Sequence, residues 1–230
     1  MAMVKKVSAT VAEVIIRESG SVYTLVLKPH GRSVRYAAGQ FLHLALADYD
    51  PSQPWPESRC FSMQSAPDEE VIRLTYAVKG GFTGHMAQKL SVGSDVWLKL
   101  PYGDLFTREH SRESTVFIAG GTGVTPFLSL FAHPRFATYR SPKLFLGLRS
   151  AAHDFYADEL ERAVQLNPDF LVTRCFQNQT GFIDSEQVLR AGLAQSAYFI
   201  SGPPEMIFYF KDFLVKRGVE PDRILTDDWE

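Results

Sequence analysis

The stretch 116–126, Val-Phe-Ile-Ala-Gly-Gly-Thr-Gly-Val-Thr-Pro, decides the fold of the second half of this chain. Its four leading apolar residues suit a short buried strand, and the glycines that follow end that strand. Pro126 suits the first turn of a helix, where its missing amide proton would have no partner in any case. A strand, a glycine turn and a helix in this order place backbone amides where they can hold a phosphate group. The stretch therefore predicts a nucleotide-binding turn.

Strands and helices alternate around this turn. Strands are predicted at 116–119, 143–148, 170–173 and 197–201, and helices at 126–131, at 155–164, after Asp184 and from Met206 to Leu214. Alternation of this kind predicts a parallel sheet with right-handed crossovers. The polar stretch 107–114 separates this half from the first. We therefore predict an α/β nucleotide-binding domain over residues 111–230.

The first half has a different rhythm, in which short segments rich in Val, Leu, Tyr and Phe are broken by turn residues. Strands are predicted at 7–16, 22–28, 41–47, 59–64, 71–78 and 95–100. Closely spaced strands without strong helices favour a small closed antiparallel barrel. Residues 1–110 are therefore predicted to form a β-barrel domain.

Composition limits the function classes. Of the 230 residues, 45% are hydrophobic and 22% charged, which is typical of a soluble globular protein. A net charge of −2 without a basic run argues against nucleic-acid binding. No apolar stretch approaches the roughly 20 residues that cross a bilayer, and the N-terminus lacks a secretory apolar core, so we expect no membrane partner and a cytoplasmic location.

The metal-binding residues are few. Two cysteines cannot ligate a four-cysteine iron–sulfur cluster or a structural zinc ion, and the six histidines show no metal-site spacing. We therefore predict no metal site, and expect any one-electron metal partner to sit on another chain.

Three further patches carry chemistry. Residues 59–62, Arg-Cys-Phe-Ser, combine a cation, an aromatic plane and a hydroxyl, which suits a bound flavin. Residues 79–86 form a glycine turn that opens a helix, and residues 201–206, Ser-Gly-Pro-Pro-Glu-Met, form a small-residue turn after an apolar strand. Each patch alone is also compatible with an ordinary strand or turn. Their order points to electron transfer from a nicotinamide to a flavin.

In this order the motifs resemble the ferredoxin–NADP reductase superfamily, whose members join a flavin-binding β-barrel to a nucleotide-binding α/β domain. The resemblance covers nearly the whole chain. In length the chain is similar to members without a fused iron–sulfur domain, such as ferredoxin/flavodoxin reductases and NAD(P)H:flavin reductases. It implies an FAD-binding barrel over 1–110 and an NAD(P)-binding domain over 111–230.

The resemblance assigns the flavin site. Arg59 would pair with the flavin phosphate, Phe61, which replaces the usual tyrosine, would lie against the isoalloxazine, and Ser62 would donate a hydrogen bond near flavin N5. Cys60 completes this motif. The glycine turn would present amides and a hydroxyl to a pyrophosphate, which implies FAD rather than FMN. The residues of that turn are Gly81, Phe82 and Thr83.

It also assigns the nicotinamide nucleotide. The pattern G-T-G-x-x-P is matched by Gly121, Thr122, Gly123 and Pro126. The pattern C-G-P-P-x-M is matched by Gly202, Pro203 and Met206, with Ser201 in place of the cysteine that sits beside nicotinamide C4. Serine keeps the size of cysteine but loses its polarisable sulfur.

Three outlying residues complete the predicted site. Arg149 and Arg174 lie where the family contacts the adenosine end, which favours NADP and leaves NAD open; both arginines could instead be solvated. Trp229 is the candidate for an aromatic residue that covers the flavin, although Glu230 follows it and a frayed tail is the alternative.

The sequence thus predicts an FAD-dependent oxidoreductase that passes hydride from NAD(P)H to bound flavin, and electrons on to a ferredoxin- or flavodoxin-type acceptor. Ser62, Ser201 and Trp229 are its predicted catalytic residues. Two alternatives stay open. One is an NAD(P)H:flavin reductase that releases reduced free flavin, and the other is a non-catalytic regulatory subunit that binds flavin or nucleotide.

Overall fold

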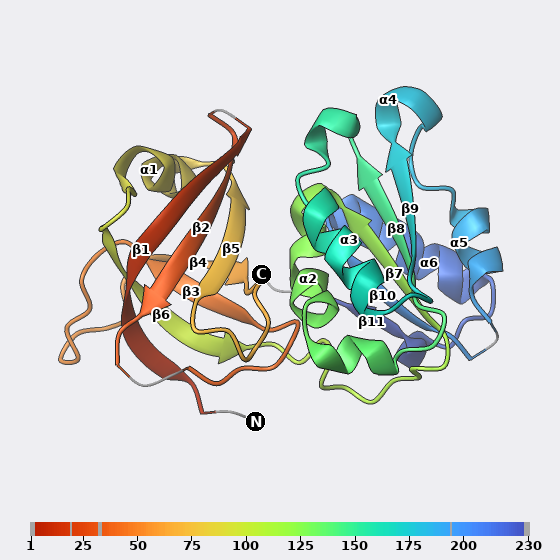
Figure 1. The fold of residues 1–230 in the computed structure, drawn as a ribbon, viewed down its shortest axis with the longest axis horizontal. Coiled ribbons are helices and arrows are strands. Elements are labelled where there is room, and N and C mark those ends of the chain that lie inside the picture. Colours follow the sequence, from red (N-terminus) through yellow and green to blue (C-terminus); the bar gives the residue numbers. More distant parts are fainter. Residues whose placement is uncertain (1–2, 19, 32–33, 194, 228–230) are drawn as a thin grey trace.

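The computed structural model describes residues 3–18, 20–31, 34–193 and 195–227. These residues form two sheets side by side (Figure 1). The last strand of the first sheet ends at Tyr102, and the first strand of the second begins at Thr115. The chain therefore has the predicted two-part architecture. A boundary at residue 110 falls in the connection between the sheets and stays a prediction.

The first sheet is antiparallel. Its strands are β1 (Lys5–Glu18), β2 (Val22–Pro29), β3 (Phe41–Ala45), β4 (Ser58–Ser62), β5 (Ile72–Ala77) and β6 (Asp95–Tyr102). They follow the order β4-β3-β6-β1-β2-β5, so β4 and β5 are its edges. The amide of Gln64, just beyond β4, donates to the carbonyl of Arg73 in β5 at 2.8 Å. The sheet is thereby almost closed into the predicted barrel.

Alternation along these strands fills the barrel interior. Leu25, Leu42 and Leu98 come from three different strands and are each 0% exposed. The sequence neighbours of Leu42 and Leu98 are partly exposed, as the two-residue period of a strand requires. Helix α1 (Gly81–Lys89) follows β5 and contributes the buried Met86 to the same core.

The second sheet is parallel, with the order β11-β10-β7-β8-β9. Its strands are β7 (Thr115–Gly120), β8 (Lys143–Leu148), β9 (Leu171–Phe176), β10 (Ala197–Ser201) and β11 (Ile224–Thr226). The helices are α2 (Thr125–Phe131), α3 (Ala157–Leu166), α4 (Gln177–Thr180), α5 (Ser185–Ala191) and α6 (Pro204–Lys216). Short 3₁₀ turns are η1 (Gly121–Val124), η2 (Pro134–Thr138), η3 (Ala151–His153) and η4 (Pro221–Arg223).

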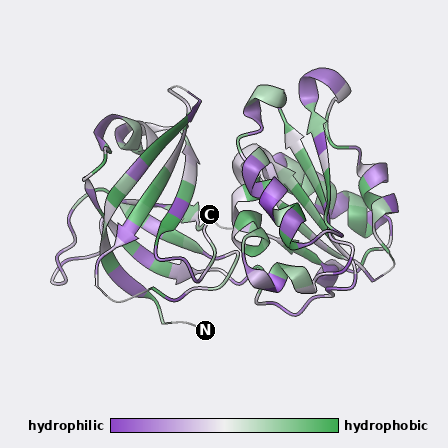
Figure 2. Ribbon diagram, in the orientation of Figure 1, coloured by the Kyte–Doolittle hydropathy of each residue, from purple (hydrophilic) through white to green (hydrophobic). Residues whose placement is uncertain are grey.

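Both faces of this sheet are covered, because helices pack on each side. Along β7, Phe117 and Ala119 enter the core shared with α2 and α3, whereas Val116 and Ile118 enter the core shared with α5 and α6. A strand buried on both faces reads as an unbroken apolar run, which is why 116–119 has no polar residue. Figure 2 shows this pattern, with hydrophobic strands inside and hydrophilic residues on outer helices such as α3.

Candidate functional site

Two short turns meet at the carboxyl edge of the second sheet. β7 and β10 are neighbouring parallel strands, with Ala119 opposite Ser201. The chain leaves β7 toward β8 on one side, whereas β10 lies on its other side, so the strand order reverses between β7 and β10. Open parallel sheets bind ligands at such a reversal, outside the carboxyl ends of the strands. The predicted nucleotide turn and the 201–206 turn both lie there.

Gly123 packs directly on the second turn. A Cβ at Gly123 would lie 2.5 Å from both the Gly202 Cα and the Ser201 carbonyl oxygen. A Cβ at Gly202 would in turn lie 3.0 Å from the Gly120 amide nitrogen. Backbone therefore packs against backbone, and only glycine leaves room for it. The two turns form one unit.

Pro203 and Met206 close this unit from the side of α6. A Cβ at Gly120 would come within 2.9 Å of Pro203 Cδ and 3.0 Å of Met206 Sδ. These predicted cofactor residues thus shape the turn by packing on Gly120. Their contact with a nucleotide stays a prediction.

Gly121 behaves differently from its neighbours. Its φ is +55°, and a Cβ there would meet nothing within 4 Å. Beside it, the Thr122 carbonyl accepts a hydrogen bond from the Thr125 hydroxyl at 2.9 Å, and Pro126 is buried in the first turn of α2. Gly121 is therefore the glycine of the turn whose open side a ligand could approach.

On the barrel, Arg59 and Phe82 come together. The Arg59 guanidinium carbon lies 5.0 Å from the centroid of the Phe82 ring, so the edge strand β4 meets the start of α1. Arg59 also pairs with Glu57 at 2.9 Å, but its side chain is 51% exposed. An exposed pair of this kind contributes about 0–1 kcal/mol, so the guanidinium remains accessible to an anionic ligand.

The start of α1 is open. The Thr83 hydroxyl accepts hydrogen bonds from the amides of Lys79 and Gly80, at 2.9 and 3.2 Å, and so caps the turn from within. A Cβ at Gly80 or Gly81 would meet nothing within 4 Å, and the first turn of α1 holds no acidic residue. The first-turn amides of a helix have no partner inside it, so this end favours a negative group.

The middle of the 59–62 motif packs into the barrel. Phe61 is 7% exposed and packs edge-on against Tyr76 in the barrel core, with ring centroids 6.2 Å apart. Cys60 Sγ lies 3.6 Å from each ring nitrogen of His43. Burial raises the pKa of the Cys60 thiol, against the opposing charge of Arg59, so the thiol is protonated at neutral pH. The predicted stacking of Phe61 on a flavin stays a prediction.

Asp227 joins the two halves of the predicted site. Its carboxylate Oδ2 lies 3.5 Å from the Ser62 hydroxyl at the end of β4, at the outer limit of a hydrogen bond. Its amide donates to the Ile200 carbonyl at 3.2 Å, next to Ser201. Ser62 and Ser201 are 6% and 5% exposed. The end of the barrel strand therefore lies beside the carboxyl edge of β10.

Sequence reasoning does not single out Asp227. It follows β11, a three-residue strand that has no prediction of its own, and it stands 165 residues from Ser62. A charge in a short polar tail carries no signal of the strand end it will meet. The predicted aromatic cover, Trp229, lies outside the described residues.

The two arginines of the predicted adenosine end have different surroundings. Arg149 is exposed just after β8. Arg174 Nε donates to Asp154 Oδ2 at 2.6 Å, and the two side chains are 31% and 15% exposed. The other carboxylate oxygen, Asp154 Oδ1, is buried and has no hydrogen-bond partner among the described residues. Asp154 is thus a second residue that the sequence analysis missed.

Two negative findings concern the described ranges only. Within them, no group of three or more His, Cys, Asp or Glu side chains could hold a metal ion. In the same part of the chain, no helix combines the length and the apolar character needed to span a bilayer.

Comparison with known proteins agrees with this geometry. Residues 117–212 match the family model of the oxidoreductase NAD-binding domain. The chain is 27% identical over 212 residues to the reductase component of propane 2-monooxygenase from Gordonia sp. (strain TY-5), covering 85% of this chain and 59% of that protein. It is 27% identical over 272 residues to a subunit of the Na(+)-translocating NADH-quinone reductase from Klebsiella pneumoniae, covering 94% of this chain and 67% of that protein.

Solved structures share the whole fold. A ferredoxin NADP+ reductase from Neisseria gonorrhoeae with bound FAD and NADP has a TM-score of 0.78 at 18% identity, over 99% of both chains. The flavohem-like FAD/NAD-binding domain of nitric oxide dioxygenase from Vibrio cholerae has a TM-score of 0.78 at 20% identity, over 97% of this chain and 98% of that one. The likeness to these structures is one of fold, and the family model adds an oxidoreductase NAD-binding domain over residues 117–212.

The shared fold is that of a nearly closed barrel beside a parallel sheet. The chain spans about 59% of the length of the propane 2-monooxygenase reductase component and 55% of its counterpart from Mycolicibacterium goodii. The activities of these longer proteins belong to them.

Proposed function

We propose that this chain is a flavoprotein reductase that binds FAD and NAD(P)H and delivers electrons to a ferredoxin- or flavodoxin-type protein. The observation that carries the proposal is the junction at Asp227, where Ser62 of the barrel lies beside the carboxyl edge of β10. Electron transfer between two bound cofactors requires their sites to adjoin, and this junction brings Ser62 close to the strand end that carries Ser201, which supports the proposal.

The residues on the barrel fit the phosphates of FAD. Arg59 offers a forked donor, which pairs with the exposed Glu57 and donates to the Ser58 carbonyl at 2.9 Å. The start of α1 adds free amides, an open surface at Gly80 and Gly81, and no acidic residue in its first turn. A dinucleotide with two phosphates suits a cation and a helix start that adjoin one another through the Arg59–Phe82 contact. We therefore propose FAD rather than FMN.

The residues at the second sheet fit a nicotinamide nucleotide. Gly121 has an open side at the strand reversal, and the packed turns around Gly123 and Gly202 bring backbone within reach of a ligand without intervening side chains. Arg174 would face the adenosine end. Because Asp154 offsets its charge, we propose that both NADPH and NADH are accepted, with NADPH favoured only modestly.

When bound, FAD would accept two electrons from NAD(P)H and pass them on one at a time to the acceptor protein. This chain would hold and shield the reacting groups. Ser62 is buried beside the Asp227 carboxylate, so its hydroxyl has a fixed neighbour that orients its proton. Ser201 is buried in the 201–206 turn. Its side chain is small, whereas a bulky one there would keep the nicotinamide ring away from the flavin ring.

The test is an anaerobic titration of the purified, FAD-loaded protein with NADPH and, separately, with NADH. We expect the absorption band of oxidised flavin to disappear with either coenzyme. Reduced protein is then mixed with a panel of ferredoxins, flavodoxins and free riboflavin. A colourless protein that does not take up added FAD, or a flavin band that neither coenzyme bleaches, would contradict the proposal. Rapid reduction of riboflavin, with no reduction of any protein acceptor, would indicate an NAD(P)H:flavin reductase instead.

A further inference from the structure

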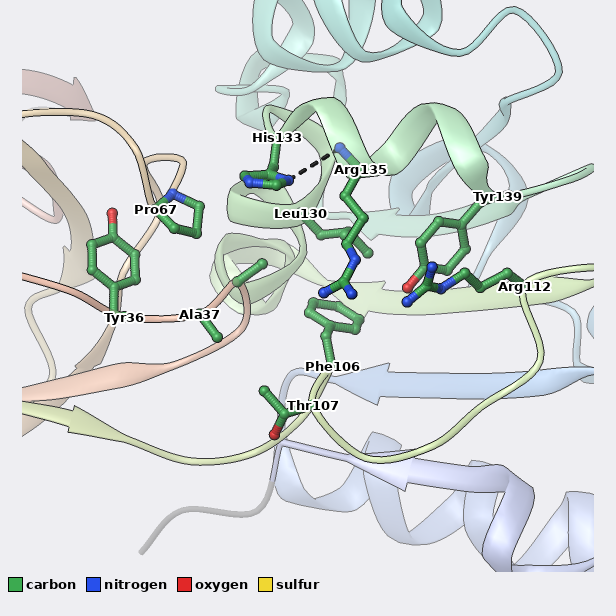
Figure 3. A pocket seen from close by; sticks show the side chains of 11 residues that line it. Tyr36, Ala37, Pro67, Phe106, Thr107, Arg112, Leu130, His133, Arg135 and Tyr139 are labelled. Atoms are coloured by element: carbon green, nitrogen blue, oxygen red, sulfur yellow. Dashed lines mark hydrogen bonds between the residues drawn. The ribbon is translucent and has the colours of Figure 1, made fainter. Parts of the chain in front are cut away.

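A pocket lies between the two halves of the molecule, at the C-terminal end of α2. Its volume is about 210 Å³. Ala37 and Pro67 line it from loops of the barrel, Phe106 from the connection between the sheets, and Leu130 from α2 (Figure 3). Arg112 and Arg135 complete the lining.

This pocket is separate from the site proposed above. The glycine turn precedes α2, whereas Leu130 is in its last turn, so the seven residues of the helix, about 10 Å, lie between the two places. Arg112 precedes β7, which places the pocket at the amino edge of the parallel sheet. Nucleotides bind at the opposite, carboxyl edge of such sheets.

Two guanidinium groups give the pocket its charge. Figure 3 shows the Arg135 side chain extending from η2 toward Phe106, and the Arg112 guanidinium beside Tyr139. The Arg112 guanidinium carbon is 5.7 Å from the centroid of the Tyr139 ring. Within the described ranges, neither arginine forms an ion pair with a carboxylate. Two guanidinium groups that no carboxylate pairs with favour an anion. On the barrel side of the pocket, the charges of Asp68 and Glu69 act on Tyr36, and Glu69 is paired with Arg73.

His110, which is hydrogen-bonded to Tyr139 of the lining, is affected by the charges of both arginines. His110 Nδ1 faces the Arg108 carbonyl at 2.7 Å and so carries the proton, which leaves Nε2 to accept from the Tyr139 hydroxyl at 2.6 Å. Burial lowers the pKa of His110, the hydrogen bond to the Arg108 carbonyl partly opposes this, and the charges of Arg112 and Arg135 act in the same direction as burial. His110 is therefore neutral at pH 7. The carbonyl end of α2 opposes an anion by at most about half a charge, against two full positive charges.

The rest of the lining is apolar apart from Thr107, His133 and the two tyrosines, Tyr36 and Tyr139. Phe106 is 8% exposed and Leu130 2% exposed, and both belong to the core on the α2 side of the sheet. At about 210 Å³, the pocket is smaller than the roughly 300–1,000 Å³ of sites for drug-sized ligands, which suits one ring with one small anionic group.

We propose that this pocket binds a monocyclic organic carboxylate. Its carboxylate would lie between the guanidinium groups of Arg112 and Arg135, and its ring would pack on Phe106 and Leu130. Because the lining comes from both halves, an occupant would contact the barrel and the sheet at once. This inference does not depend on the proposed electron-transfer function.

The experiment is isothermal titration of the FAD-loaded protein with benzoate, and with its neutral analogue benzamide. We expect benzoate to bind with a dissociation constant below about 10 mM, and benzamide to bind at least roughly tenfold more weakly. The R112Q and R135Q double variant should lose benzoate binding by roughly tenfold or more. The control is Arg140→Gln, an arginine that pairs with Glu113 outside the pocket and should leave benzoate affinity within about twofold.

A second variant separates the apolar part of the pocket from its charge. Ala37→Leu should fill the pocket and block benzoate while leaving both arginines in place. Absence of benzoate binding to the wild-type protein would overturn the proposal, as would equal binding by the double variant or by A37L. Tighter binding of inorganic phosphate than of benzoate would also overturn it, because the site would then select an anion without a ring. Competition between benzoate and NADP+ would place benzoate in the nucleotide site, with the same consequence.

Discussion

At the residue scale, Arg59 is the barrel residue that we expect to contribute most to FAD binding. It holds Glu57 and covers Phe82, and both contacts are exposed enough to be exchanged for a ligand. Arg59→Ala should weaken FAD binding by roughly tenfold to a hundredfold, because a charge-assisted hydrogen bond contributes about 1.5–3 kcal/mol. Quenching of FAD fluorescence on titration measures this. The matched control is Arg140→Ala, far from α1, and equal FAD affinity in both variants would remove Arg59 from the site.

Asp154 offers a second test on a single residue. Its carboxylate, 2.6 Å from Arg174 Nε, offsets the charge that would meet a 2′-phosphate. Asp154→Asn should therefore raise kcat/KM for NADPH by several-fold, up to roughly tenfold, and leave that for NADH nearly unchanged. Arg174→Gln should shift the ratio of the two the other way. The control is Asp158→Asn, an acid in the first turn of α3. A ratio that neither variant moves would exclude this pair from coenzyme choice.

At the scale of elements, the glycine turn has a packing role in addition to its predicted role in binding a nucleotide. The sequence indicates glycine at 123 because a nucleotide needs close approach, whereas the structure adds that its missing side chain makes room for the backbone of Ser201 and Gly202. The β7–α2 turn and the β10–α6 turn thus stabilise one another. This contact fixes the shape of both turns in the absence of a ligand.

Gly123→Ala should consequently destabilise the protein, even without a nucleotide. The added methyl would meet backbone, which cannot rotate away, so we expect a loss of about 1–3 kcal/mol in the free energy of unfolding. Gly84→Ala in α1 is the control: a Cβ there meets nothing within 4 Å, and alanine favours a helix by about 0.5–1 kcal/mol. Urea unfolding of both variants measures the difference. Equal stability of G123A and the wild-type protein would contradict this account of the turn.

At the scale of the whole molecule, a few polar contacts join the barrel to the sheet. The Gly39 amide donates to the Ser129 hydroxyl at 2.8 Å in a buried position. Arg17, near the end of β1, donates to the Phe155 carbonyl and to the Thr24 hydroxyl, each at 3.1 Å. These contacts set how the two halves face each other, and hence whether Ser62 reaches Asp227.

Arg17→Ala should loosen that junction. It removes two hydrogen bonds and a 3.5 Å ion pair with Glu159, so we expect the free energy of unfolding to fall by about 1–3 kcal/mol. Cleavage by trypsin or chymotrypsin in the 103–114 connection should become faster as the halves separate. Arg140→Ala, whose partner lies in its own half, should change neither quantity. Unaltered proteolysis and stability in R17A would show that the junction does not depend on this residue.

Stability should also fall in mild acid. Burial holds the pKa of His110 below its ordinary value of 6.5, so the unfolded chain takes up its proton first as the pH drops. The contribution of neutral His110 is complete above that value and is lost as the pH falls through it toward the folded pKa. Melting temperatures measured from about pH 7.5 to about pH 5.5 should decrease, and His110→Gln should make the decrease smaller. The exposed His85→Gln should not alter it.

The sequence predicts most strands and helices correctly, but it predicts few of the contacts between them. The predicted strands at 143–148 and 197–201 have the observed bounds, because apolar runs flanked by turn residues define them locally. The strand at 224–226 had no prediction, since three residues carry too little periodicity to stand out. Phe61 is predicted to lie against a flavin; the structure adds that it is 7% exposed and packs edge-on against Tyr76 of β5, a contact between strands that the sequence does not reveal.

By itself, the sequence determined a barrel followed by a parallel sheet, a glycine turn at the end of β7 and the order of the binding motifs. Those features depend on neighbouring residues, whose periodicity and turn chemistry act over a few positions. The tertiary structure alone decided that Asp227 meets Ser62, that Asp154 holds Arg174, and that Arg112 and Arg135 share a pocket with Ala37. Each of these pairings joins residues from different elements, so it exists only once the strands have taken their places in the two sheets.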